Sequence, residues 1–286
     1  MTANPSTRPG TGLVRSRLQL TVDGVPLDLA VASRAGEGAP VLVLHGFGGT
    51  KEDYADAALH PAFGGRPVIA YDAPGCGETS CADLSAVSIP FLVATARAVL
   101  AASGVDQFHL VGHSMGGLTG LLLADGDPAR VVSFVDIEGN VAPEDCFLSR
   151  QIAGHPRLRP TAFLRAFVDR VWSSGEFSAA LYAAGLPHKV RADAVRPIFE
   201  SMVELSDHGN LLARFLGLPF PRMFMYGQQN RSLSYLPALA DHGVELAEIP
   251  HSGHWPMYSN APAMWTRITE FLSRVGADDG PRGPAS

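Results

Sequence analysis

The chain contains 286 residues with a formal net charge of −6 at pH 7, and 46% of its residues are hydrophobic while 17% are charged. This balance is typical of a globular chain with a sizeable core and excludes an intrinsically disordered protein. The chain also lacks the basic excess needed to bind nucleic acid or an anionic membrane surface, so we expect neither as a partner.

Three cysteines, Cys76, Cys81 and Cys146, are too few and too irregularly spaced for a disulfide framework. Segment 1–16 is polar and lacks the apolar stretch of a signal peptide, and no run approaches the ~18 apolar residues of a membrane span. We therefore expect 1–16 to be a disordered leader. The protein is expected to work in the reducing cytoplasm, as a monomer or homodimer.

The first two predicted strands, 17–22 and 25–31, are joined by Asp23-Gly24, a two-residue hairpin signal. Continuous apolar runs predict strands buried on both faces, at 40–45, 67–71, 108–111 and 131–138. Helices are predicted between them at 51–59, at 89–102 and after residue 116. This alternation predicts an α/β fold with a mostly parallel sheet and helices on both faces.

The alternation stops between residues 141 and 218, where no strand pattern is visible. Apolar residues at helical spacing, such as Phe163 and Phe167, predict an all-helical insertion, which we call the cap segment. The alternating pattern then resumes, with strands at 222–226 and 244–249 and helices at 234–241 and 261–275. We therefore predict a core of residues 17–140 and 219–275, a cap segment 141–218 and a flexible tail 276–286.

Residues 112–116 read Gly-His-Ser-Met-Gly and lie between a predicted buried strand and a predicted helix. This is the setting of a nucleophile elbow, in which a sharp turn projects the serine hydroxyl above the edge of the sheet. We therefore predict Ser114 as a nucleophile and expect His113 to turn its side chain away. A glycine-rich turn with an incidental serine is the alternative interpretation.

A serine nucleophile needs a base, and histidine titrates in the suitable range. Of the ten histidines, His254 follows the last predicted strand, where active sites of open α/β sheets form, and precedes the final helix. We select it over His251, which we expect to be structural. The oxyanion of acyl transfer also needs N–H donors, and we expect them from the backbones of Met115 and Phe47.

Four motifs together resemble the α/β-hydrolase fold superfamily over residues 17–275. They are the His-Gly-Phe-Gly-Gly loop 45–49, the turn 72–79, the elbow 112–116 and the Ser-Gly-His loop 252–254. The resemblance implies a serine hydrolase with a helical cap and the chain order serine, acid, histidine. Asp72, in the turn, is expected to be structural.

The acid of that set departs from the usual pattern. Most of the family carries it after the strand that follows the cap, where this chain has Asn230, and a neutral amide cannot stabilise an imidazolium as a carboxylate does. Some members carry it instead at the end of the strand before the cap, where this chain has Asp136 and Glu138. Alternation points both the same way, with Glu138 at the strand tip. We predict Glu138 as the acid, with Asp136 and Asn230 as alternatives.

The leading functional hypothesis is a serine hydrolase that cleaves an ester, thioester or lactone of a small molecule through an acyl-enzyme. The apolar cap, with Phe47, Phe147 and Trp255 as expected substrate contacts, favours a hydrophobic or mixed substrate, acyl-carrier and CoA thioesters included. Elimination, cyclisation or acyl transfer at the same site is the alternative, and a ligand receptor is a third hypothesis. Neither metal-ligand spacing nor a phosphate-binding loop is visible, so we expect no cofactor and no metal.

Overall fold

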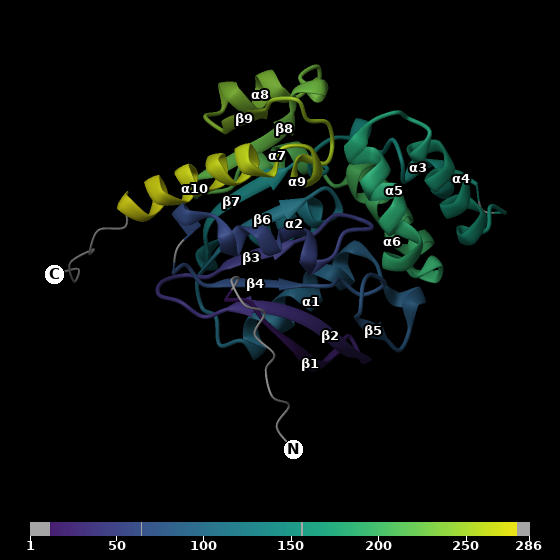
Figure 1. Cartoon of the computed structure of the whole chain (residues 1–286), viewed down its shortest axis with the longest axis horizontal. Helices are drawn as coiled ribbons and strands as arrows, with labels where there is room; N and C mark the ends of the chain where they lie inside the picture. Colours follow the sequence, from purple (N-terminus) through teal and green to yellow (C-terminus); the bar gives the residue numbers. More distant parts are fainter. Residues whose placement is uncertain (1–11, 64, 156, 279–286) are drawn as a thin grey trace.

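The computed structural model describes residues 12–278 except residues 64 and 156. Its strands are β1 (Val14–Val22), β2 (Val25–Arg34), β3 (Val41–Leu44), β4 (Val68–Tyr71), β5 (Ser80–Cys81), β6 (Phe108–His113), β7 (Val131–Ile137), β8 (Arg222–Gly227) and β9 (Glu245–Ile249). They form one sheet ordered β1-β2-β4-β3-β6-β7-β8-β9, with β5 paired to β2. β2 pairs antiparallel with β1, β4 and β5, and the neighbours in the order β4-β3-β6-β7-β8-β9 pair parallel. This topology confirms the predicted α/β fold (Figure 1).

The helices of the described residues are α1 (Ile89–Ala102), α2 (Met115–Gly126), α3 (Arg150–Ala153), α4 (Pro160–Trp172), α5 (Phe177–Lys189), α6 (Ala192–His208), α7 (Leu211–Leu216), α8 (Leu236–Asp241), α9 (Pro256–Ser259) and α10 (Ala261–Asp278). Short 3₁₀ helices include η1 (Lys51–Leu59), η2 (Pro61–Phe63) and η6 (Gln228–Asn230). The predicted helix at 51–59 therefore forms, but with the tighter 3₁₀ winding.

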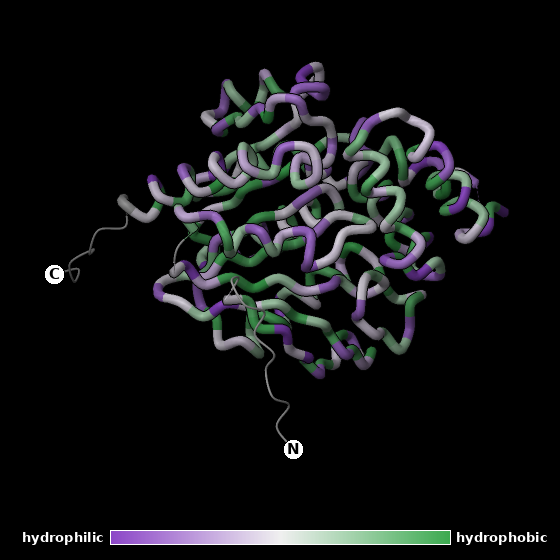
Figure 2. Tube along the Cα trace, viewed as in Figure 1, coloured by the Kyte–Doolittle hydropathy of each residue, from purple (hydrophilic) through white to green (hydrophobic). Residues whose placement is uncertain are grey.

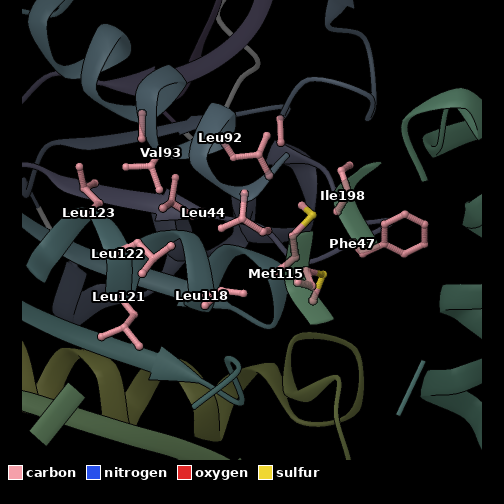
Figure 3. Close-up of a cluster of buried hydrophobic side chains, with 14 of the residues drawn as sticks. Leu44, Phe47, Leu92, Val93, Met115, Leu118, Leu121, Leu122, Leu123 and Ile198 are labelled. Carbon is pink, nitrogen blue, oxygen red and sulfur yellow. The ribbon is translucent and has the colours of Figure 1, made fainter. Parts of the chain in front are cut away.

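Alternating side chains along the buried strands build one apolar layer on each face of the sheet. Leu42 and Leu44 of β3 belong to a cluster with side chains of α1, α2, α7 and α8. Val41 and Val43 belong to a second cluster, with η1, η2, α9 and α10. Figure 3 shows part of the first cluster, from Leu123 on α2 to Phe47 beside Ile198 of α6, and Figure 2 shows the apolar strands at the centre of the molecule. The sheet is therefore covered by helices on both faces.

Between β7 and β8 the described chain forms only helices. Helices α3 to α6 lie together at one end of the sheet, on the right in Figure 1. Residues of α4, α5 and α6 line a cavity together with Ser114, which follows β6, so these helices lie over the carboxyl ends of the strands. Helix α7 packs against α2 and so covers one face of the sheet instead.

Some predicted boundaries were wrong. β1 begins at Val14, because Val14, Arg15 and Ser16 pair with β2 and so do not belong to a leader. The first residues of the predicted tail continue α10 to Asp278, and the rest of the predicted leader and tail, 1–11 and 279–286, lies outside the described residues. β5 had no signal in the sequence because it has only two residues. Within the described residues, no helix is long and apolar enough to cross a membrane.

Candidate active site

Ser114 lies at the turn between β6 and α2, with φ +52° and ψ −117°, a conformation that is strained for any residue other than glycine. Two glycines allow the turn to be this tight. A Cβ on Gly112 would lie 2.5 Å from the carbonyl oxygen of Gly116, and a Cβ on Gly116 would lie 2.2 Å from that of Leu44. The Gly-x-Ser-x-Gly pattern therefore forms a strand–turn–helix elbow with half-buried Ser114 at its apex.

Two adjoining cavities open beside Ser114, and both are also lined by His254 and Trp255. The smaller, of about 30 Å³, has a largely aromatic wall that includes Phe47, Phe147, Phe167, Tyr182 and Phe199. The larger, of about 360 Å³, has a wall rich in carboxyl and amide groups that includes Glu138, Asn140, Glu144, Asp145, Glu176, Gln229 and Asn230. The elbow serine thus lies between an apolar and a polar space.

Glu138, which follows β7, and His254, which follows β9, are in direct contact. The Nδ1–H of His254 donates a hydrogen bond of 2.8 Å to Oε2 of Glu138, whose side chain is only 6% exposed. The backbone N–H of Gly227 donates to Oε1 at 2.7 Å. Burial favours the protonated carboxyl, but the hydrogen bonds and the nearby imidazole outweigh it and hold the pKa of Glu138 below its ordinary value. Glu138 is therefore a buried carboxylate with a lowered pKa that accepts a hydrogen bond from the His254 ring.

The other two candidates for the acid are placed differently. Asp136 is fully buried beneath α2, where its Oδ1 accepts the Gly139 N–H at 2.8 Å, and burial raises its pKa well above the ordinary value. The alternation that predicted one direction for both carboxylates does not reach Glu138, since β7 ends at Ile137 and Glu138 has φ +46°. Asn230 contacts Glu138 through its amide.

The two residues expected to donate to the oxyanion lie at the start of α2 and in the loop after β3. Met115 is the first residue of α2, so its N–H has no partner within the helix. Phe47 lies in the loop after β3, and its N–H forms no backbone hydrogen bond within the described residues. Its carbonyl oxygen accepts a 2.8 Å hydrogen bond from the hydroxyl of Tyr182 on α5. The cap segment thereby holds this loop in place.

A buried ion pair follows the loop after β3, since Lys51 at the start of η1 pairs with Asp72. Asp72 Oδ1 accepts the backbone N–H of Lys51 at 2.8 Å, and its Oδ2 accepts the Lys51 ammonium at 2.9 Å. Both side chains are almost completely buried. Burial favours the neutral form of Asp72, but these contacts, together with His45, lower its pKa. Asp72 therefore acts as a structural anchor.

His113 contradicts our expectation that its side chain turns away from the site. It lines the smaller cavity, and its Nε2–H donates a 2.8 Å hydrogen bond to the carbonyl oxygen of His254. Burial is the main reason that the pKa of His113 falls to about 3, so the ring is neutral. Sequence reasoning missed this contact because it joins residues far apart in the chain, and the only signal was the position of His113 inside the elbow.

The expected substrate contacts Phe47, Phe147 and Trp255 all line the smaller cavity. Phe147 is 59% exposed and presents its ring edge-on to that of His254, with the centroids 5.8 Å apart. Trp255 stacks on Tyr182 at 4.6 Å. His251 is exposed, has φ +56° and is held by a hydrogen bond from its N–H to Oε1 of Gln228.

Within the described residues, the Ser114 hydroxyl forms no hydrogen bond. Such contacts are often long in a substrate-free site and shorten when substrate binds. The arrangement as a whole combines a strained serine, a histidine oriented by an ionised carboxylate and two backbone donors beside one apolar cavity. These are the components of acyl-transfer chemistry.

Comparison with known proteins agrees with this geometry. A family model described as the alpha/beta hydrolase family matches residues 41–265. A protein from Variovorax paradoxus, provisionally named carbamate hydrolase RutD, is 27% identical over 90% of this chain and 100% of its own length. An esterase from Thermogutta terrifontis superposes with a TM-score of 0.74 at 20% identity, covering 91% of this chain and 99% of its own. The N-acyl homoserine lactonase AidH superposes with a TM-score of 0.70 at 19% identity, covering 96% and 100%. The chain therefore belongs to the alpha/beta hydrolase family and is an enzyme of the hydrolase class.

Proposed function

We propose that this enzyme is a serine hydrolase that cleaves an ester, thioester or lactone bond in a small, largely apolar molecule. The observation that carries the proposal is the 2.8 Å contact between Glu138 and His254 in the wall of the larger cavity, which Ser114 also lines. A carboxylate that accepts the Nδ1–H of a histidine, next to an elbow serine, is the arrangement that activates a hydroxyl for attack on a carbonyl carbon.

In the proposed reaction, the Ser114 oxygen attacks the carbonyl carbon while Nε2 of His254 accepts the hydroxyl proton. Glu138 stabilises the imidazolium that forms, and the N–H groups of Phe47 and Met115 stabilise the oxyanion. His254 then donates the proton to the leaving group, which departs and leaves an acyl-enzyme. A water molecule, deprotonated by His254, attacks the acyl carbon, and His254 returns the proton to the Ser114 oxygen as the acid is released.

The walls of the two cavities support a neutral substrate with an apolar part. Aromatic side chains surround the smaller space, and the larger one carries Glu144, Asp145 and Glu176. Neither wall includes a lysine or arginine among the described residues. We expect the phosphate groups of a CoA thioester to be disfavoured here for that reason. We further propose that the cap segment 141–218 shapes and covers this space.

The names of the relatives also support a carboxyl-derivative substrate. They include an esterase, an N-acyl homoserine lactonase and proline iminopeptidases, one of which, from Levilactobacillus brevis, is 24% identical over 82% of this chain. These relatives differ in the leaving group that they act on. An assay with varied acyl and leaving groups therefore identifies the substrate of this enzyme.

A fluorophosphonate probe tests the covalent mechanism. We expect one adduct on the wild type by intact-mass measurement and none on Ser114→Ala, while Ser16→Ala, an exposed serine on β1, is labelled normally. A panel of p-nitrophenyl esters of increasing acyl length then tests hydrolysis, with product masses showing the gain of one water. Absence of both labelling and ester turnover in the folded wild type would contradict the proposal.

A further inference from the structure

The carboxylate of Glu138 has a second side-chain partner besides His254. Asn230, at the end of η6 after β8, places its Nδ2 2.9 Å from Oε1 and 2.8 Å from Oε2 of Glu138. An amide oxygen facing the same carboxylate would be repelled, so this contact fixes which way the amide points. The NH₂ group therefore spans both oxygens of the acid.

We propose that Asn230 is a positioning residue, whose amide keeps Glu138 ionised and turned toward His254. The proposal rests on the proposed function, in which Ser114, His254 and Glu138 form the catalytic triad. It adds the Asn230 amide, from η6 after β8, as a partner of the Glu138 carboxylate, which follows β7. Asn230 lines the larger cavity, but among the described residues it forms no hydrogen bond with Ser114.

The backbone of Glu138 explains why such support is needed. β7 ends at Ile137, and Glu138 follows in the left-handed region at φ +46°. Regular strand geometry therefore does not aim this side chain. Its direction depends on the groups at its tip, namely the Gly227 N–H, the Asn230 amide and the His254 ring. Without the Asn230 amide, Oε2 would have only His254 as a hydrogen-bond partner among the residues that the structure describes.

The charge of the partner matters as much as its position. An amide stabilises a buried carboxylate by donating hydrogen bonds, and it neither takes up a proton nor adds a negative charge. A carboxylate at position 230 would meet that of Glu138 at hydrogen-bond distance. Two such acids retain a proton between them, or raise the pKa of the neighbouring imidazole by their summed charge. The summed charge of two carboxylates keeps His254 protonated to higher pH, and a shared proton weakens the carboxylate that stabilises the imidazolium, so either outcome reduces the action of His254 as a base.

A purely structural role, in which Asn230 only holds η6 in place, predicts a different pattern. Under that role, Asn230→Asp is harmful whatever residue occupies position 138. Under our proposal, its effect depends on the charge at 138. In a Glu138→Gln background, Asn230→Asp returns one carboxylate to the cluster, next to the side chain that contacts His254.

The test is therefore a double-mutant cycle of Asn230→Asp and Glu138→Gln, read as the pH profile of kcat/KM for the best ester. We expect Asn230→Asp alone to move the acidic limb upward by about one pH unit, reducing the rate near neutrality about tenfold. In the Glu138→Gln background, we expect the same change to raise the rate by about tenfold. A matched change, Gln107→Glu, adds a charge at an exposed position just before β6 and should leave the profile unchanged.

A second readout does not depend on turnover. NMR titration of the His254 imidazole should show its pKa raised by Asn230→Asp, lowered by Glu138→Gln and returned toward the wild-type value in the double variant. A roughly tenfold loss of kcat/KM from Asn230→Asp in both backgrounds, or an unmoved imidazole pKa in all variants, would overturn the role of Asn230. If Asn230→Asp does not fold, Asn230→Ala replaces it. We expect this variant to have a lower kcat and an unchanged KM. An unchanged kcat would overturn the proposal. If the variants show this titration pattern but the fluorophosphonate probe does not label Ser114 of the wild type, the result counts against the proposed function alone.

Discussion

The hydroxyl of Tyr182 on α5 donates a 2.8 Å hydrogen bond to the carbonyl oxygen of Phe47 in the loop after β3. The same tyrosine ring stacks on Trp255, which follows His254. One side chain of the cap segment thus contacts both the loop expected to bind the oxyanion and the loop that carries the expected base. The cap segment therefore contributes to the geometry of the site as well as to the wall of its cavity.

Tyr182→Phe tests this contact because it removes only the hydroxyl. The Phe47 carbonyl then loses its buried partner, which costs about 1–3 kcal/mol of unfolding free energy. The loop also becomes less fixed, and we expect kcat to fall by roughly tenfold with little change in KM. Steady-state kinetics and urea unfolding measure the two effects. Tyr226→Phe is the matched control, since within the described residues the Tyr226 hydroxyl forms no hydrogen bond. Equal losses in both variants would contradict the specific role of Tyr182.

Gly48 tests how closely α5 approaches the same loop. It has φ +72°, and a Cβ there would lie 2.3 Å from Cδ2 of Leu186 on α5. Gly48→Ala should therefore push the loop and α5 apart, lowering both kcat and stability. Gly104→Ala has a similar φ of +64° but nothing within 4 Å of the added Cβ, so it reports the backbone strain alone. We expect Gly104→Ala to lose stability by about 1 kcal/mol and to keep full kcat. A kcat loss shared by both variants would argue against crowding at α5.

His113 predicts a pH dependence of stability. Burial lowers its pKa to about 3 from the ordinary value of 6.5, so between pH 6.5 and 3 the unfolded chain binds a proton that the folded chain does not. The unfolding free energy therefore falls as the pH drops from 6.5 toward 3. His113→Gln removes this contribution while retaining a donor for the His254 carbonyl. We expect the variant to lose less stability than the wild type over this window, measured by urea unfolding at several pH values. Parallel curves would show that His113 does not titrate on unfolding.

Much of the fold could be read from the sequence because its signals are local. The continuous apolar runs of the parallel strands, the glycines around Ser114 and the helical spacing in the cap segment each depend on residues close together in the chain. The departure at Asn230 was also visible, and it moved the expected acid to Glu138. Glu138 contacts His254 in the structure, and its role as the acid stays a prediction.

What the sequence did not reveal are contacts between distant segments. The hydrogen bonds from Tyr182 to Phe47 and from His113 to the His254 carbonyl join residues separated by more than a hundred positions. Neither side chain carries a motif that announces such a partner. The left-handed backbone of Glu138 was likewise hidden, because the alternation of a strand says nothing about the residue after its end.

The central claim is that Glu138 is the acid that supports His254, and Asp136 provides the internal comparison. Glu138→Gln removes the charge in contact with the imidazole but preserves the size of the side chain. Asp136→Asn is equally conservative, and Asp136 is buried, accepts the Gly139 N–H and forms no hydrogen bond with His254 among the described residues.

The most direct measurement is kcat of these two variants on the best ester, at a pH near neutrality, with thermal unfolding confirming that both are folded. We expect Glu138→Gln to lower kcat by about three to four orders of magnitude, and Asp136→Asn to stay within roughly tenfold of the wild type. Nearly full activity of Glu138→Gln together with loss of activity in Asp136→Asn would contradict the account.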